Sequence, residues 1–501
     1  MTDLSLPLLL ALPAVAAVAL AAIPLPDRAA RLLGVVATAA PLVVAVVVAA
    51  RFDYGHGGQM QQTVDASWLP AIDVRFHLGV DGISLPLVLL TALLTFLCAV
   101  YTLASAPTGG TTRNFLALVL LLEVGVLGTF TALDLVLFFV SFEVVLIPMY
   151  FLIAAWGGPA RAAAATKFIL FTLLGSGLMF VGFLVLYAQA GTFDITVLAA
   201  QHGRGIGAGA QLLAFVLLML GFGIKSPMWP LHTWLPDAHT EAPTVGSVLL
   251  AGVLLKMGTY GLVRVAVGAA PDGARRAAPA LGLLAAIGIV YAALACLALV
   301  RDGDLKRLIA FSSVGHMGFV LLGIATLTPV GIQGALIGNI AHGLITGLLF
   351  FLVGSVKDRF HTSEISELGG GLLAKLPAVG GLLLAASIAS LGLPGLAGFW
   401  GEMLAMLGAW SPAAALSRPL FLVLMAVAGV GTVLTALYFV AMLRRVDFGV
   451  VPDRWRDGAV ADAMPAELAA WVPLIALALA VGLWPRLVLG VTDAAVHGLL
   501  Q

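Results

Sequence analysis

The chain has 501 residues, of which 61% are hydrophobic and only 10% are charged, and its mean hydropathy is +1.10. This composition is typical of a polytopic membrane protein and excludes an ordinary soluble enzyme. The 25 basic and 25 acidic residues cancel, so the charge gives no indication of a nucleic-acid partner. Cys98 and Cys296 lie far apart without a CxxC spacing or a neighbouring histidine, which argues against a disulfide or a metal site.

Runs of about 20 apolar residues predict an all-α polytopic membrane protein with about fourteen transmembrane helices. The first run lacks a basic leader and is followed by a second span, so we expect a membrane helix rather than a cleaved signal peptide. An extended polar connection, Arg51–His77, separates the second and third helices. The predicted helices begin near Leu4, Leu32, Val80, Asn114, Asp134, Ala165, Ala210, Glu241, Ala277, Leu305, Val330, Leu376, Arg418 and Pro465.

The basic residues predict how the chain is oriented in the membrane. With these helices, the loops at one end carry fifteen of the 25 lysines and arginines and those at the other end carry seven. The remaining three, Lys225, Lys256 and Arg264, lie within spans. By the positive-inside rule the richer end faces the cytoplasm, so both termini face away from it. The run 301–307, which includes Lys306, is interpreted as an anchor at the cytoplasmic end.

Two of the predicted helices are interrupted. Pro227 and Pro230 follow Lys225 in the seventh helix, and the sequence Gly392-Leu393-Pro394-Gly395 interrupts the twelfth. Each interrupted helix is the fourth in a block of five, and an odd number of helices inverts the second block relative to the first. Paired interruptions of this kind indicate an inverted-repeat transporter. The predicted parts are 1–113 (three N-terminal helices), 114–268 (first five-helix repeat), 269–445 (second, inverted repeat) and 446–501 (last helix).

Six ionisable residues lie near the middle of their predicted spans. An isolated charge at the bilayer centre costs about 2.5–3.5 kcal/mol, so each needs compensation. Acids, lysines and histidines at one depth suit a proton relay, because burial and neighbouring charges move their pKa values toward neutrality. The alternative is a set of buried ion pairs or hydrogen bonds that only hold helices together. The six residues are Glu143, Lys225, Lys256, His316, His342 and Glu402.

Three further residues are weaker candidates. Glu123 lies in the fourth helix and is either a relay member or a packing bond. His232 and His239 follow the first interruption and either line a proton entry or accompany a capping role of Asp237. The sequence has no nucleotide fingerprint, haem motif or iron–sulfur cysteine pattern, so we expect no redox chemistry in this chain.

Several segments resemble the antiporter-like subunits of respiratory complex I. The most specific is GFGIKSPMWPLHTWLPDAHTEAPTVGSVLLAGVLLKMGTYGLVR. The chain M (subunit 4) branch is resembled by FEVVLIPMYFLIAAWGG, DLKRLIAFSSVGHMGFVLLGI and LGLPGLAGFWGEM. Chain L normally carries a long lateral helix, for which this sequence has no room. Chain N and the related subunits of multisubunit sodium/proton antiporters usually have lysine where Glu402 stands.

The resemblance implies a proton channel driven by NADH:quinone electron transfer, so that the chain is a translocase subunit of NADH:quinone oxidoreductase. Glu143 and Lys225 would form the interacting pair of the first half-channel, and Lys256 the central connector. His316 and His342 would pass the proton on to Glu402 near the exit.

The same resemblance implies the surroundings of the chain. No cofactor or metal is expected in it, whereas flavin, iron–sulfur clusters and quinone belong to partner subunits. The expected partners are neighbouring chains L and N, small membrane subunits and the lipid bilayer, in a bacterial plasma membrane. The alternatives are a subunit of a multisubunit sodium/proton antiporter or membrane-bound hydrogenase, and a membrane scaffold without transport.

Overall fold

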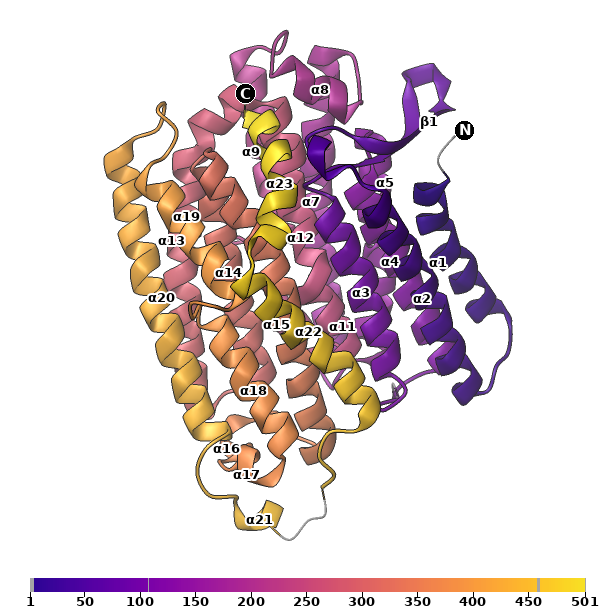
Figure 1. Cartoon of the computed structure of the whole chain (residues 1–501), viewed down its shortest axis with the longest axis vertical. Helices are drawn as coiled ribbons and strands as arrows, with labels where there is room; N and C mark the ends of the chain where they lie inside the picture. The colour runs from indigo at the N-terminus through magenta and orange to yellow at the C-terminus, as the bar shows by residue number, and fades with distance from the viewer. Residues whose placement is uncertain (1–3, 107, 457–459, 501) are drawn as a thin grey trace.

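The computed structural model describes residues 4–106, 108–456 and 460–500. Its long helices run side by side and form one bundle (Figure 1). Twelve helices in these ranges are long and apolar enough to cross a membrane, and Leu85–Tyr101 and Pro377–Ser390 are shorter apolar helices. The chain is a helical polytopic membrane protein with one β-hairpin, and its sequence predicted the helical membrane architecture.

The N-terminal part consists of three helices and one β-hairpin. The polar connection predicted between the second and third helices forms the hairpin, with two antiparallel strands and two short 3-10 turns. A backbone bridge from Leu78 to Ala132 joins the hairpin to the segment before α5. The elements are α1 (Ser5–Ala22), α2 (Asp27–Arg51), η1 (Tyr54–His56), β1 (Gln61–Leu69), η2 (Pro70–Ile72), β2 (Val74–Val80) and α3 (Leu85–Tyr101).

The next group contains the first broken helix, which is divided into α9 and α10. The last span of this group runs without a break from α11 to η4 and contains two π-helical segments, η3 and η4, on either side of α12. The elements are α4 (Thr112–Thr131), α5 (Leu135–Val144), α6 (Leu146–Trp156), α7 (Arg161–Ala190), α8 (Ile195–Gln201), α9 (Ala208–Lys225), α10 (Trp234–Glu241), α11 (Thr244–Leu249), η3 (Leu250–Leu254), α12 (Leu255–Gly261) and η4 (Leu262–Val267).

The remaining elements contain the second broken helix, divided into α18 and α19. They end in α22, which crosses the surface of the bundle obliquely, and α23, which runs nearly along it (Figure 1). The elements are α13 (Pro271–Asp302), α14 (Leu305–Ala325), α15 (Pro329–Phe360), α16 (Ile365–Leu368), α17 (Leu372–Lys375), α18 (Pro377–Ser390), α19 (Ala397–Trp410), α20 (Arg418–Val446), α21 (Asp453–Arg456), α22 (Pro465–Leu483) and α23 (Arg486–Leu500).

The helices α5 and α14 begin in the same way. Asp134 and Asp304 cap them by accepting hydrogen bonds from backbone N–H groups of the first turn. Each aspartate also forms a backbone bridge to the residue that precedes a short helix, Asp194 before α8 and Glu364 before α16. The helices α8 and α16 lie at opposite ends of the bundle (Figure 1). The two groups of helices therefore share one local arrangement at opposite ends.

Burial divides the helices into a centre and a periphery. The span from α11 to η4 is enclosed along its whole length, and α14 and α15 are nearly so. By contrast, α1, α2 and α20 bury only about a third of their residues or less within the chain. Polar side chains on the central helices therefore have protein around them, as a chain in a bilayer requires.

Candidate functional site

The first helix break lies directly after Lys225. The helix α9 ends there because Pro227 and Pro230 have no N–H group to continue its hydrogen-bond ladder. The indole Nε1 of Trp234 donates to the freed carbonyl of Ile224 at 3.0 Å. The break is thus stabilised by a side chain of the helix that follows it, as irregular backbone at this depth requires.

Lys225 is buried, with 2% of its surface exposed. Its Nζ lies over the ring of Phe142, 4.9 Å from the centroid, which is cation–π geometry. The neighbouring Glu143 acts on it electrostatically, but no hydrogen bond or ion pair joins these two residues in the described ranges. The structure therefore places the predicted pair next to each other without direct contact.

Two glutamates of the first group of helices have carboxylate oxygens without a hydrogen-bond partner among the described residues. Glu143 is half-buried, and its Oε1 has no hydrogen-bond partner among the described residues. Glu123 on α4 is completely buried, and in the same ranges neither of its carboxylate oxygens has a partner. Glu123 is therefore not joined to the other predicted site residues.

Lys256 lies on α12 at the centre of the bundle and is completely buried. Its Nζ donates to the carbonyl of Ala251, in the π-helical segment η3, and lies 2.7 Å from Nδ1 of His342. Such π-helical segments expose carbonyls to side chains and often occur at functional sites. Lys256 and His342 are therefore in direct hydrogen-bond contact across two helices.

The two predicted histidines face each other. The rings of His316 on α14 and His342 on α15 have centroids 5.7 Å apart and an interplanar angle of 67°. Nε2 of His316 lies 2.9 Å from Oγ of Ser390, at the end of α18. The second broken helix thus supplies a hydroxyl to the relay candidate on α14.

Glu402 completes the series on α19. Its Oε1 lies 3.5 Å from Nδ1 of His316, an ion-pair distance, and its Oε2 accepts a hydrogen bond from the Thr432 hydroxyl at 3.2 Å. Gly392, in the break before α19, has φ of +76°, and a Cβ there would lie 3.2 Å from the same carboxylate. Glycine is suited to this position because it tolerates the left-handed backbone and, without a Cβ, leaves room for the Glu402 carboxylate.

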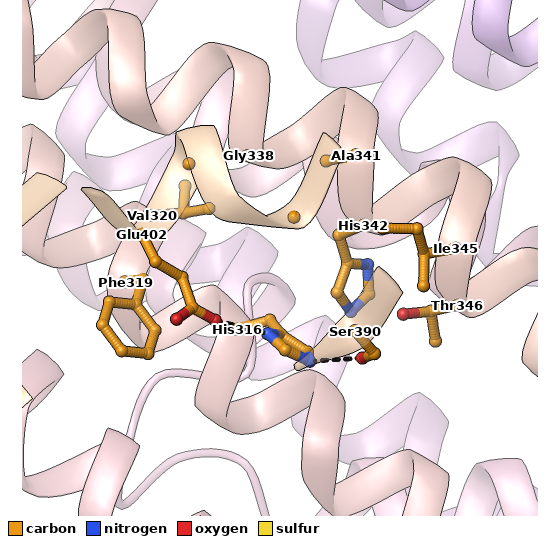
Figure 2. A pocket seen from close by; sticks show the side chains of 12 residues that line it. His316, Phe319, Val320, Gly338, Ala341, His342, Ile345, Thr346, Ser390 and Glu402 are labelled. Atoms are coloured by element: carbon orange, nitrogen blue, oxygen red, sulfur yellow. Dashed lines mark hydrogen bonds and ion pairs between the residues drawn. The ribbon is translucent and has the colours of Figure 1, made fainter. Parts of the chain in front are cut away.

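A cavity of about 30 Å³ lies among these side chains (Figure 2). Because a cavity of about 10–15 Å³ holds one water molecule, about two would fit. His342 Nε2, Glu402 Oε1 and Thr346 Oγ1 have no hydrogen-bond partner in the described part of the chain. Water in this cavity could supply the hydrogen bonds that these atoms lack.

The two histidines after the first break lie in aromatic surroundings. His232 is buried and meets the ring of Tyr291 edge-on, with centroids 5.0 Å apart. His239 is completely buried and stacks on Phe350, with centroids 4.3 Å apart and an angle of 9°. Among the described residues, neither ring nitrogen of His239 has a hydrogen-bond partner.

Two features of the basic residues are not predicted from the sequence. Arg264 pairs with the buried Asp81 at the end of the bundle that carries the termini, which accounts for one of the three charges within spans. Lys306, interpreted from the sequence as an anchor, is instead 2% exposed and donates to the carbonyl of Ala242. Its position in a basic run hid its burial, because adjacent residues on a helix face different directions.

Two carboxyl groups outside the spans have displaced pKa values. Burial raises the pKa of Asp447, which follows α20, to about 7. Burial also acts to raise the pKa of Asp194, but hydrogen bonds from His77 and Thr196 outweigh it and hold that pKa at about 2. The His77–Asp194 contact of 2.9 Å fastens the hairpin to the start of α8.

No group of three or more histidine, cysteine or acidic side chains in the described ranges has a metal-binding arrangement. Cys98 and Cys296 are both buried and unpaired. The candidate site is therefore the series of ionisable side chains alone.

Residues 132–435 match the family model described as NADH:quinone oxidoreductase/Mrp antiporter, TM. The chain belongs to this family. It is 40% identical to NADH-quinone oxidoreductase subunit M of Rhodobacter capsulatus, over 98% of this chain and 95% of that protein. A chain of respiratory complex I from Thermus thermophilus is 31% identical and superposes with a TM-score of 0.86 over all of both chains. A chain of the Mrp complex from Dietzia sp. DQ12-45-1b shares the fold at 23% identity, with a TM-score of 0.86 over 100% of this chain and 98% of that one.

The relatives confirm the family predicted from the sequence motifs. The match covers the segment from the start of α5 to the middle of α20, and so includes all six ionisable residues predicted at mid-span. This antiporter-like membrane subunit is thus similar, over its whole length, to subunits of an NADH–quinone oxidoreductase.

Proposed function

We propose that this chain translocates protons as a membrane subunit of an NADH:quinone oxidoreductase. The observation that carries the proposal is the series Lys256–His342–His316–Glu402, in which each side chain lies beside the next. These residues come from four helix segments and meet in the enclosed part of the bundle. Four ionisable groups would be an expensive way to hold apolar helices together, since buried ion pairs seldom stabilise more than apolar packing does.

The contacts suggest how a proton would move. Charged Lys256 can give a proton to Nδ1 of His342, and the imidazolium can release the other proton from Nε2, which faces the cavity. His316 can accept it directly or through water and pass it toward Glu402, which lies 3.5 Å away. Each step moves one proton between two groups and leaves the donor ready to be loaded again.

The first half-channel would control when Lys256 is loaded. A negative Glu143 close to Lys225 favours the charged lysine, whereas a neutral or displaced Glu143 favours its release of a proton. Moving one charge against a potential of 100 mV takes about 2.3 kcal/mol, which a change of about two pKa units supplies. Because the helix is broken directly after Lys225, the backbone there could shift and move the lysine side chain relative to Glu143.

We also infer that 114–268 and 269–445 are inverted repeats, flanked by three helices in 1–113 and by the C-terminal part 446–501. The equivalent caps and bridges at Asp134 and Asp304, at opposite ends of the bundle, support this division. The two breaks occupy the same place in each group.

The orientation follows from the loop charges. The end of the bundle with more lysine and arginine would face the cytoplasm of a bacterial plasma membrane, with both termini on the other side. Both termini lie at one end of the bundle, as an even number of spans requires (Figure 1). Partner membrane subunits, including chains related to L and N, would flank this chain, and flavin, iron–sulfur clusters and quinone would belong to other subunits.

The variants Lys225→Ala and Lys225→Arg test the proposal. Arginine keeps the charge but cannot readily release a proton, so both variants should abolish pumping in an assembled complex. The measurement is proton uptake by inverted membrane vesicles together with NADH:quinone reductase turnover. Normal pumping by either variant at normal turnover would show that Lys225 is not part of a relay.

Purification of the native complex tests the choice between families of complexes. Co-purifying flavin and iron–sulfur subunits are expected. Their absence from a stable complex would favour the alternative of a multisubunit sodium/proton antiporter.

A further inference from the structure

A second cavity, of about 210 Å³, opens at the end of the bundle that carries most of the basic residues. It lies where the α3–α4 and α6–α7 connections meet the starts of α11 and α14 and the end of α15. Its wall combines acidic and basic side chains: Glu241, Asp358, Lys306 and Lys357. A cavity of this size and polarity would hold several water molecules.

Lys306 is the buried cation of this wall. Its ammonium group donates to the carbonyl of Ala242, the residue directly after α10. By contrast, Lys357 is half-buried, and Arg307 pairs with Asp237 where both side chains are partly exposed. Lys306 thus joins the water-accessible cavity to the end of the helix that carries His239.

His239 is close enough to both lysines to be affected by their charges. The cations that act on its ring electrostatically are Lys306 and Lys256. The ring is stacked on Phe350, and neither of its nitrogens has a partner in the described ranges. A histidine with unpaired buried nitrogens is less favourable for packing than phenylalanine, which would stack equally well.

We propose that Lys306 loads protons from water in the 210 Å³ cavity and that His239 passes them to Lys256. This inference rests on the proposed function. Neutral Lys306 takes a proton from hydronium in the cavity, swings away from the Ala242 carbonyl and protonates one nitrogen of His239. The other nitrogen of His239 then releases its proton to neutral Lys256. Lys306 and His239 are then neutral again once the ring turns over, and Lys256 carries the proton as an ammonium group that can pass it to His342. On this path protons reach Lys256 without passing through Lys225, and the charge of Lys225 would set when Lys256 accepts them.

The variant His239→Phe separates transport from packing. It keeps the stacking on Phe350 and removes only nitrogens that bond to nothing in the described structure. If His239 only packs, proton pumping in inverted vesicles stays normal. The proposal predicts a loss of pumping in an assembled complex with normal subunit content.

The variant Lys306→Met tests the loading residue, and Arg307→Gln is its matched control. Arg307 is the next residue of the same helix and carries the same charge, but it does not line the cavity. Pumping should be lost in Lys306→Met and retained in Arg307→Gln. Normal pumping in Lys306→Met would overturn the inference; if Lys225→Ala still abolishes pumping, the proposed function stands.

A labelling experiment covers the case in which these variants do not assemble. Thr108→Cys places a thiol at the exposed wall of the cavity, while Cys98 and Cys296 are buried. A charged, membrane-impermeant thiol reagent applied to the basic side of the assembled complex should reduce pumping. Complete labelling with unchanged pumping would show that the cavity does not feed the relay.

Discussion

Around α15 the ionisable side chains follow one another at contact distance, whereas around α9 they stand apart. Lys256 touches His342, His342 faces His316, and His316 lies 3.5 Å from a carboxylate. Lys225 instead rests on an aromatic ring, and the nearby Glu143 makes no direct bond to it in the described ranges. The side chains around α15 form a continuous series of contacts, whereas those around α9 leave a gap between Lys225 and Glu143.

The difference shows where control can act. A connected series passes protons whenever its first member is charged, and so it cannot hold a gradient by itself. A gap that closed only when Glu143 approached Lys225 would make loading conditional, because the Coulombic energy rises steeply as charges approach in a medium of low dielectric constant. Transport would therefore be gated near the first break and conducted near the second.

The largest effect is expected from breaking the connected series at its middle. His342→Phe keeps an aromatic ring but removes both nitrogens, so Lys256 loses its acceptor and pumping should be abolished. Proton uptake by inverted vesicles measures this. His497→Phe, at an exposed histidine of α23, is the control and should pump normally. Normal pumping in His342→Phe would mean that protons bypass α15.

Neutralising the terminal acid should have nearly as large an effect. Glu402→Gln can still accept the hydrogen bond from Thr432, but it cannot take up a proton from His316. Pumping should fall to a small residual level. Thr432→Val, which removes only that hydrogen bond, should retain most of it. Equal losses in the two variants would indicate that the bond, rather than the charge, matters.

Changing the aromatic support of Lys225 should have a moderate effect. Phe142→Leu removes a cation–π interaction of about 0.5–2 kcal/mol, so the pumping rate should change by roughly 2-fold to 30-fold without being lost. Stopped-flow measurement of proton uptake checks this. An unchanged rate would mean that the Phe142 ring does not influence proton release from Lys225. Complete loss of pumping would mean that the ring is required for transport and does more than support Lys225.

The smallest effect lies outside both regions. Because burial raises the pKa of Asp447 to about 7, the native state binds a proton that the unfolded state has lost between about pH 4 and pH 7. Stability therefore falls as the pH rises through this window. Asp447→Asn should unfold at a higher temperature than the unmodified protein at about pH 8.5 and show no such gain near pH 4. Pumping should stay unchanged, which separates this site from the two regions above.

Much of the fold could be predicted from the sequence because lipid imposes simple rules. Apolar runs marked the spans, and proline and glycine marked the breaks after Lys225 and before Glu402, where α9 and α18 end. The cost of burying charge also selected side chains that meet in space, such as Lys256 and His342.

Other features depend on tertiary geometry that sequence patterns do not encode. The sequence predicts that Glu143 and Lys225 interact, but it does not predict that the ammonium group lies over the Phe142 ring. Lys306 was interpreted as an anchor because its charged neighbours masked its burial. The β-hairpin arises from pairing across a bulged register, which hydropathy alone does not reveal.

The proton-to-electron ratio of the purified complex carrying Lys256→Arg, reconstituted in liposomes, tests the connected series most directly. Arginine keeps the positive charge and can donate to Ala251 and His342, but it does not release its proton at physiological pH. We predict normal assembly and a ratio as low as that of the complex carrying His342→Phe. An unchanged ratio would contradict the claim that protons pass along Lys256, His342, His316 and Glu402.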